Sequence, residues 1–406
     1  MYGRIVHLSM LFLLVIFSLS TNADVQEQLD ETTVEYVFGE QITFHAKFHS
    51  NTAIKAATIF FQAETDTHTN LGEVTVKPGG QSVTDVTPSY NLSYSHSLAD
   101  YRIRTFSKVD YHYEIKLVDG QTYKSPTFNF YYSDNRFNWQ ILEEKPFRVF
   151  WYEGDLAFAQ SILDVSQEGL LHIQNLMPFS PPPALDIYVY TNAVDMQAVL
   201  NPTSANWVAG HADPDLGVIV VTLPPGLDRQ LTMEQRLPHE LAHILLYQSV
   251  RSGYASLPVW LNEGLASLSE LYPNPDYRIT LDNAVEKDSL LPISSLCNTF
   301  PRDASNALLS YAQSASFVGY LHDRYGTPGL QRLVSTYANG LGCEQGAKTA
   351  LGTGLTQLER QWRRDALAEN LTLTAFYNLL PWLILLAAAL AVPLFLTIHR
   401  LRVKTA

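Results

Sequence analysis

Residues 238–243 have the sequence Pro-His-Glu-Leu-Ala-His and lie within an apolar periodicity that is typical of a helix. Side chains four residues apart project from one helical face at about 5–6 Å, so His239 and His243 can reach the same metal ion. Glu240 lies about 100° further round the helix, where it can accept a proton from a water molecule beside that ion. The alternative is a buried histidine pair without chemistry. The spacing predicts a metal site with a general base next to it.

A second segment supplies a third ligand. Residues 258–266, Pro-Val-Trp-Leu-Asn-Glu-Gly-Leu-Ala, contain Glu263 in an otherwise apolar run, where an unpaired carboxylate would be costly. Catalytic zinc usually has three protein ligands and a water molecule. Ser252 and Gly253 allow the chain to turn, so that Glu263 points at the two histidines from a neighbouring antiparallel helix. We therefore predict one zinc ion per chain, and we expect Glu270, two turns further along the same helix, to be dispensable.

The two motifs together resemble those of the gluzincin metallopeptidases, in which a glutamate within W-L-x-E-G-x-A is the third zinc ligand. The resemblance is greatest to bacterial membrane-attached proteins with a peptidase MA-like domain, and it covers about residues 147–367. It implies that His239, His243 and Glu263 bind zinc and that Glu240 is the catalytic base. It also implies a tyrosine on a later helix that stabilises the oxyanion. Tyr311 stands in the matching segment, with an ordinary packing tyrosine as the alternative.

The strand expected above the metal departs from the patterns of that group. The aminopeptidase branch has G-x-M-E-N, with a glutamate that captures the substrate amine, whereas residues 207–212 are Trp-Val-Ala-Gly-His-Ala. The thermolysin-like branch has an aspartate four residues after its glutamate ligand, where this chain has Ser267. Gly210 would let a substrate backbone approach the edge of the strand. His211 is a candidate second oxyanion donor, with a loop histidine of no chemical role as the alternative.

Residues 24–138 are predicted to form an all-β sandwich of the immunoglobulin or fibronectin type. In residues 41–48 apolar and polar side chains alternate, as expected for a strand with one buried face. Four further short runs have the same character: residues 57–62, 72–76, 111–118 and 127–132. The N-terminal half of the fold prediction therefore depends on periodicity alone.

From residue 139 the pattern changes to alternating strands and helices, followed by a mainly helical stretch. The expected strands are residues 147–152, 185–190 and 217–222, and the expected first helices are residues 156–177 and 194–200. A small sheet followed by helices predicts an α+β domain, here a metallopeptidase domain of the gluzincin type at residues 139–368.

The two ends of the chain predict export and a membrane anchor. Arg4, an apolar stretch and small residues near Ala23 are typical of a signal peptide at residues 1–23, with an uncleaved anchor as the alternative. Residues 377–398 lie in a stretch without charge and are expected to form a transmembrane helix. Basic residues follow, so residues 399–406 are expected to be cytoplasmic and the ectodomain extracytoplasmic. The chain is thus predicted to be a single-pass cell-membrane protein that contacts lipid through this helix.

Charge and cysteine content narrow the possible partners. The 406 residues include 27 Lys and Arg against 40 Asp and Glu, a net charge of −13, which argues against a nucleic-acid-binding surface. An oxidising compartment favours a disulfide between Cys297 and Cys343, with two free thiols as the alternative. The expected partner is a peptide or protein substrate. The sequence leaves the oligomeric state open.

These observations predict a membrane-anchored zinc metallopeptidase. Glu240 would remove a proton from the hydrolytic water and pass it to the leaving amine. The rival hypothesis is a surface binding or adhesion protein that works through its β region and keeps the peptidase fold as an idle scaffold. The complete set of ligands and base favours the enzyme, since a decayed site has no need of all four residues.

Overall fold

The structure, a computed structural model, describes residues 28–64, 66–79, 87–200, 210–367, 379–387 and 389–391. The chain divides into two compact units. The first unit consists of Met1–Arg102 and Lys108–Tyr131, and the second consists of Ile103–Ser107 and Tyr132–Ala406.

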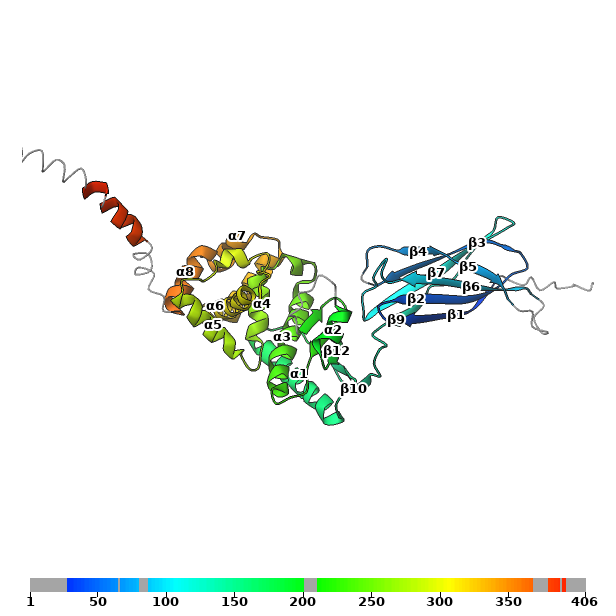
Figure 1. Cartoon of the computed structure of the whole chain (residues 1–406), viewed down its shortest axis with the longest axis horizontal. Helices are drawn as coiled ribbons and strands as arrows, with labels where there is room; N and C mark the ends of the chain where they lie inside the picture. Colours follow the sequence, from blue (N-terminus) through cyan, green and yellow to red (C-terminus); the bar gives the residue numbers. More distant parts are fainter. Residues whose placement is uncertain are drawn as a thin grey trace, which may run out of the picture. The chain divides into compact units, whose positions relative to one another are not determined.

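The first unit is built from antiparallel strands in two sheets (Figure 1). One sheet has the order β1-β2-β6-β5, and the other has the order β4-β3-β7-β8 with β9 paired to β7. The strands are β1 (Gln28–Val37), β2 (Gln41–His49), β3 (Ile54–Ala63), β4 (Asn70–Glu73), β5 (Thr75–Pro78), β6 (Ser89–Ser97), β7 (Ser107–Leu117), β8 (Thr122–Lys124) and β9 (Phe128–Tyr132). An all-β N-terminal region is therefore confirmed.

The alternation in β2 marks the core face of its sheet. Ile42, Phe44 and Phe48 are fully buried, as the period of two predicted. The Phe44 ring lies 5.2 Å from the rings of Phe61 and Tyr111, which belong to the other sheet. Aromatic contacts of this kind between the two inner faces form the core of a sandwich.

One expected strand of this unit is wrong. The run at residues 72–76 is not a single strand, because it passes from β4 in one sheet to β5 in the other. Val74 lies at the crossing, where its N–H donates to the carbonyl of Ala57. Alternation is the same on both sides of a change of sheet, so periodicity could not reveal the break.

The second unit begins with a five-stranded mixed sheet of order β10-β11-β12-β14-β13. The strands β11, β12 and β14 are parallel, and β10 and β13 are antiparallel edge strands. The elements of the sheet region are β10 (Gln140–Glu144), β11 (Phe147–Trp151), α1 (Leu156–Leu176), β12 (Leu185–Tyr190), α2 (Ala193–Val199), β13 (Gly210–Asp213) and β14 (Val218–Thr222). The expected strands and first helices are confirmed to within a residue or two, whereas β10 and β13 were not predicted.

The rest of this unit is helical, as predicted. Its elements are α3 (Arg229–Val250), η1 (Arg251–Ser256), α4 (Val259–Leu268), α5 (Pro275–Glu286), η2 (Ile293–Leu296), α6 (Ala304–Ala338), α7 (Cys343–Leu351) and α8 (Leu355–Asp365). Helices α1 and α3 share an apolar core with the sheet. Trp260 of α4 is fully buried in a second core, where its ring lies 5.1 Å from that of Phe317 in α6.

The predicted disulfide between Cys297 and Cys343 is present. Both cysteines contact the start of α4. The N–H of Val259 donates to the carbonyl of Cys297 at 2.9 Å, and the indole N–H of Trp260 points at Sγ of Cys343 at 3.4 Å. The bridge therefore ties the first turn of α4 to two segments that are distant in sequence.

Two further predictions concern the ends of the chain. The signal peptide at residues 1–23 and the tail at residues 399–406 lie outside the described residues. The transmembrane helix predicted at residues 377–398 is described only at 379–387 and 389–391. Within the ranges that the structure describes, no helix is both long and apolar enough to cross a membrane. The transmembrane helix thus receives no support here and stays a prediction.

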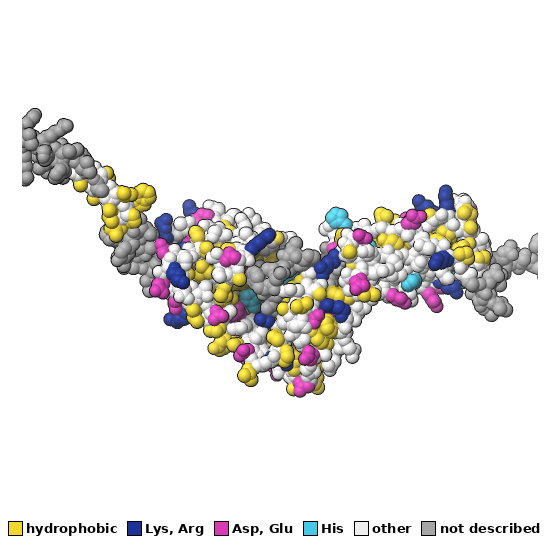
Figure 2. Space-filling model, viewed as in Figure 1, with side chains coloured by type: hydrophobic (Ala, Val, Ile, Leu, Met, Phe, Trp, Pro, Cys, Tyr) yellow, Lys and Arg dark blue, Asp and Glu magenta, His cyan; other side chains and the backbone are white. Residues whose placement is uncertain are grey.

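Figure 2 shows acidic and basic side chains interspersed on the visible face of the molecule. Such mixing is common on the surface of a protein with an excess of acidic residues.

Candidate active site

Helix α3 presents both histidines of the first motif on one face. The ring centroids of His239 and His243 are 5.1 Å apart, as expected for positions four residues apart. Pro238, inside the helix, packs against α1 at Gly169, where a Cβ atom would lie 2.9 Å from the proline Cγ. The glycine thus allows α1 and α3 to approach closely at the turn that precedes the first histidine.

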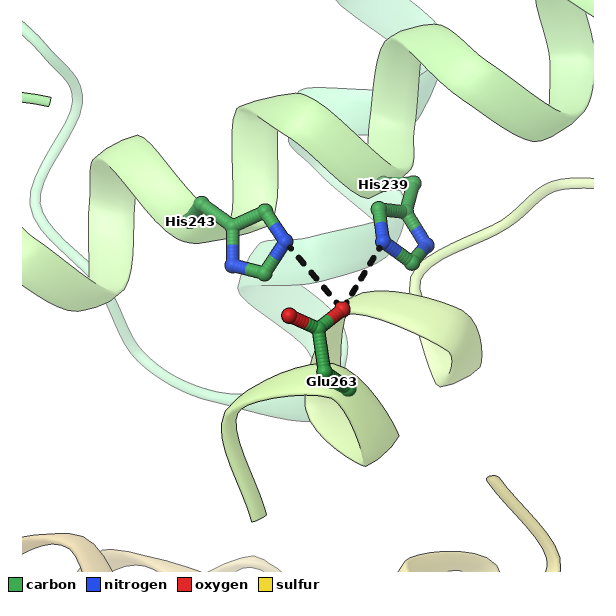
Figure 3. Close-up of side chains that lie close together, drawn as sticks. All are labelled: His239, His243 and Glu263. Atoms are coloured by element: carbon green, nitrogen blue, oxygen red, sulfur yellow. Dashed lines mark ion pairs between the residues drawn. The ribbon is translucent and has the colours of Figure 1, made fainter. Parts of the chain in front are cut away.

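Glu263 is brought to the histidines by α4 (Figure 3). A Cβ atom at the next residue, Gly264, would lie 2.4 Å from Cγ2 of Val318 and 2.6 Å from the carbonyl oxygen of Ser314 in α6. Only glycine permits this approach of the two helices. Buried Trp260 on one side and Gly264 on the other therefore hold the backbone of Glu263 in place.

The three predicted ligands meet at one point. Oε2 of Glu263 lies 3.4 Å from Nε2 of His239 and 3.6 Å from Nε2 of His243. The three donor atoms all lie within 4.8 Å of one another. Their side chains are 12–18% exposed, so the group is sheltered but accessible from outside. Two imidazoles and one carboxylate in this arrangement are a typical donor set for catalytic zinc.

The other nitrogen of each imidazole is also engaged. Nδ1 of His239 lies 3.1 Å from Oε1 of Glu270, and Nδ1 of His243 lies 3.0 Å from Oδ1 of Asn262. An acceptor at Nδ1 favours the tautomer that leaves Nε2 free for a metal ion. The surroundings of both histidines therefore fit zinc ligation as well as the ligands themselves do.

The contact to Glu270 corrects an expectation from the sequence. Glu270 was expected two turns further along the same helix, but α4 ends at Leu268. Beyond that end the chain brings the Glu270 carboxylate back to His239, with only 5% of the side chain exposed. Its Oε2 is buried without a hydrogen-bond partner among the described residues, which is costly unless the charge is compensated nearby. No local sequence pattern predicted that Glu270 would contact His239.

The carboxylates around His239 and His243 form a negatively charged site that favours a cation. Glu240, Glu263 and Glu270 surround the two imidazoles, and within the described part of the chain none of them has Lys or Arg within 4 Å. Burial lowers the pKa of His239, but hydrogen bonds to Glu263 and Glu270 raise it to about 10. Burial raises the pKa of Glu263, yet the two histidines hold it below its usual value. A divalent cation would satisfy the same carboxylates.

Glu240 also lies beside the edge strand β13. A Cβ atom at Gly210 would lie 2.5 Å from Oε1 of Glu240, so a larger residue there would force the Glu240 carboxylate to move. The next residue, His211, is 40% exposed, and its Nε2 lies 3.7 Å from Oδ1 of Asp213. Burial lowers the pKa of His211, but Asp213 raises it above the ordinary value. The structure thus places both predicted substrate-binding residues beside the predicted base.

Tyr311 approaches from α6. Its ring centroid lies 6.3 Å from that of His239 and 5.1 Å from that of Phe300. Burial, with the charges of Glu263 and Glu240, raises the pKa of Tyr311 well above its ordinary value. The phenol stays protonated at neutral pH and can donate a hydrogen bond.

Sequence reasoning missed a second tyrosine. Tyr254 lies in η1, and its hydroxyl accepts a hydrogen bond from Nδ2 of Asn262 at 2.9 Å and lies 3.4 Å from Nδ1 of His243. Burial raises the pKa of Tyr254 to about 12, with smaller contributions from Glu263 and Glu240. The only signal in the sequence was its position in the turn between the two motifs.

The second unit also matches a known protein family. The family model described as the peptidase MA superfamily matches residues 165–368, which is half of the chain and includes both motifs. No curated protein sequence matches the chain.

Solved structures show only weak likeness. An aminopeptidase N family protein from Idiomarina loihiensis is 10% identical with a TM-score of 0.35, and the match covers 81% of this chain and 72% of that one. A cycloalternan-degrading enzyme from Trueperella pyogenes is 14% identical with a TM-score of 0.18, over 29% of this chain and 16% of that one. Both scores are too low to establish a shared fold.

Proposed function

We propose that this chain, which belongs to the peptidase MA superfamily, hydrolyses peptide bonds at a zinc ion held by His239, His243 and Glu263. The observation that supports this most directly is the convergence of the three donor atoms within 4.8 Å, with an acceptor at Nδ1 of each histidine. When bound, zinc supplies a Lewis acid that polarises the scissile carbonyl and lowers the pKa of water.

Glu240 is the general base in this proposal. Its carboxylate accepts a proton from the hydrolytic water and passes it to the leaving amine, so the group returns to its starting state after each turnover. Its carboxylate lies beside Gly210 and is not one of the three donor atoms that converge around Glu263. Glu240 is therefore available for proton transfer and is not needed as a ligand.

The strand β13 is the proposed substrate template. It is an edge strand, antiparallel to β14, so its outer side can pair with an extended peptide. Gly210 lets that peptide approach Glu240, because no side chain stands between them. His211 and Tyr311 are the proposed donors to the oxyanion, since both can present an N–H or O–H at neutral pH.

We further propose that the C-terminal segment anchors the protein in a cell membrane with the peptidase unit on the extracytoplasmic side. The described residues of this segment are helical, and their large apolar side chains are exposed: Leu379, Trp382, Leu383, Ile384, Leu385, Leu386 and Leu390. A contiguous apolar surface of this kind suits contact with lipid. Fractionation of cells expressing the full chain, with protease protection of its two ends, tests this proposal.

The peptidase proposal is tested by digesting an unbiased peptide library with the purified full chain. We expect cleavage that a chelator abolishes and that zinc restores, and no cleavage by the Glu240→Gln variant. A zinc-loaded, folded protein that cleaves nothing would favour the rival hypothesis, a binding protein with an idle peptidase scaffold. Ligand capture by the first unit alone would then become the relevant activity.

A further inference from the structure

Arg236 lies one helical turn before Glu240 on α3. The motifs predicted no role for it. Positions four residues apart on a helix are neighbours at about 5–6 Å between Cβ atoms. Arg236 is partly buried and is close enough to Glu240 for that carboxylate to act on it electrostatically. A fixed positive charge therefore stands beside the proposed catalytic base.

The guanidinium has a fixed orientation but no acidic partner. One of its N–H groups donates to the carbonyl of Thr222 at the end of β14. Among the described residues, no carboxylate lies within 4 Å of it. None of its nitrogens is both buried and unpaired, so the N–H groups that do not bond Thr222 reach accessible space.

Arg104 shows the opposite situation in the same unit. Its guanidinium is paired with both Asp213 and Asp215, so its charge is compensated within the protein. Burial of Arg236 without such a pair costs free energy, and it lowers the pKa of that guanidinium. An oriented arginine without a direct ion pair suits a ligand that brings its own negative charge.

The location determines which part of a substrate can reach this charge. A peptide on β13 passes Gly210, which touches Glu240, and β13 pairs with β14 next to the strand end that Arg236 contacts. Successive residues of an extended peptide are about 3.3–3.4 Å apart. A residue at or next to the scissile bond therefore places its side chain, or its terminal carboxylate, within reach of Arg236.

We propose that Arg236 binds a substrate carboxylate beside the scissile bond, so that the chain prefers peptides carrying one at that position. This rests on the proposed peptidase function. The carboxylate can be an Asp or Glu side chain or the free C-terminus of a short peptide, and both would form the same paired hydrogen bonds with the guanidinium.

The experiment starts from one peptide that the zinc-loaded full chain cleaves. Matched versions carry Glu or Gln at each of the two residues that flank the scissile bond, and each is made with a C-terminal acid or amide. For wild type we expect kcat/KM to be at least roughly tenfold higher for the Glu peptide or the C-terminal acid, as for a partly desolvated ion pair. The amidated Glu peptide has only the side-chain carboxylate, so it distinguishes that group from the free C-terminus.

The variants assign the preference to one residue. Arg236→Gln should bring the Glu-to-Gln ratio close to one, and Arg236→Glu should favour a Lys peptide instead. Arg278→Gln is the control for charge loss, because that side chain is 89% exposed on α5, and it should keep the wild-type ratio. Zinc content and thermal unfolding show whether each variant is folded. If the Arg236 variants misfold, the Glu-to-Gln ratio of kcat/KM for wild type and its decrease with added salt test the inference instead.

Three results would overturn the inference. They are a wild-type ratio near one for every pair, an unchanged ratio in folded Arg236→Gln, and an equal loss on all peptides with a shifted pH profile. The last would show that Arg236 acts on Glu240 rather than on substrate. If wild type cleaves nothing, the proposed function fails instead. Titration of zinc-loaded Glu240→Gln with the Glu and Gln peptides then still measures whether the site prefers a carboxylate.

Discussion

Glu270 holds His239 from the side opposite the predicted metal site. Its Oε1 lies 3.1 Å from Nδ1 of His239, while Nε2 of the same ring faces Glu263 at 3.4 Å. One imidazole is thus clamped between two carboxylates, of which one is a proposed ligand and the other a positioning residue. In the equivalent place His243 has two neutral groups, the amide of Asn262 at 3.0 Å and the hydroxyl of Tyr254 at 3.4 Å. The two histidines are therefore held with different strength, and the difference can be measured.

Glu270→Gln should weaken zinc binding by about 10- to 100-fold, because loss of a partner at Nδ1 lowers ligand basicity and orientation. Competition with a chelator of known affinity measures the change. Glu286→Gln, the same change at an exposed position of α5, is the matched control and should bind zinc as wild type does. Equal affinity in both variants would remove the positioning role of Glu270.

Glu263→Ala should weaken zinc binding by orders of magnitude, since only two protein ligands then remain. The loss should exceed that of Glu270→Gln, because a ligand contributes more than a group that orients one. Metal analysis after gel filtration, with circular dichroism to confirm folding, compares the two variants. A larger loss of zinc affinity in Glu270→Gln than in Glu263→Ala would mean that Glu270 is the ligand and Glu263 the positioning residue.

Glu240→Gln should keep its zinc and lose nearly all turnover, because an amide cannot accept the proton of water. Metal content and kcat on a cleaved peptide separate the two properties. Turnover near that of wild type would mean that another group is the base, and a loss of zinc would mean that Glu240 is a ligand.

The pair His211 and Asp213 predicts a pH dependence. Because Asp213 raises the pKa of His211 in the folded state, the stabilisation is complete below the unfolded value of about 6.5 and is lost as pH rises through the folded pKa. Asp213→Asn should lower the His211 pKa, since burial lowers it and Asp213 is the main group that raises it. Histidine NMR titration measures this shift. Asp215→Asn should leave the His211 pKa unchanged, because Asp215 contacts Arg104 but is not among the groups that shift the pKa of His211.

Removal of the Cys297–Cys343 disulfide should destabilise the second unit by about 4 kcal/mol in the chain-entropy model, for a sequence separation of 46 residues. Because both cysteines contact the start of α4, the Cys297→Ala, Cys343→Ala variant should also bind zinc more weakly. Denaturant unfolding followed by tryptophan fluorescence measures the first effect and chelator competition the second. An unchanged zinc affinity would show that α4 is held without the bridge.

Much of the site could be predicted from the sequence because its spacing is local. His239 and His243 share a face since a helix repeats every 3.6 residues, and β2 buries Ile42 and Phe44 since a strand repeats every two. These periods follow from backbone hydrogen bonds at constant offsets along the chain, so they are visible without tertiary structure.

The roles of residues outside these local repeats depend on tertiary packing. Glu270 reaches His239 only because α4 ends at Leu268. The proposed role of Arg236 depends on its position beside β13 and the end of β14. Glu263 lies between these cases, because its motif and apolar setting predicted a ligand, whereas Gly264 against α6 decides where that ligand points. Contacts between distant segments arise from the way whole cores pack, and no interval along the chain specifies them. The sequence by itself therefore determined the local pattern of ligands and base, and the tertiary structure alone decided which charges surround them.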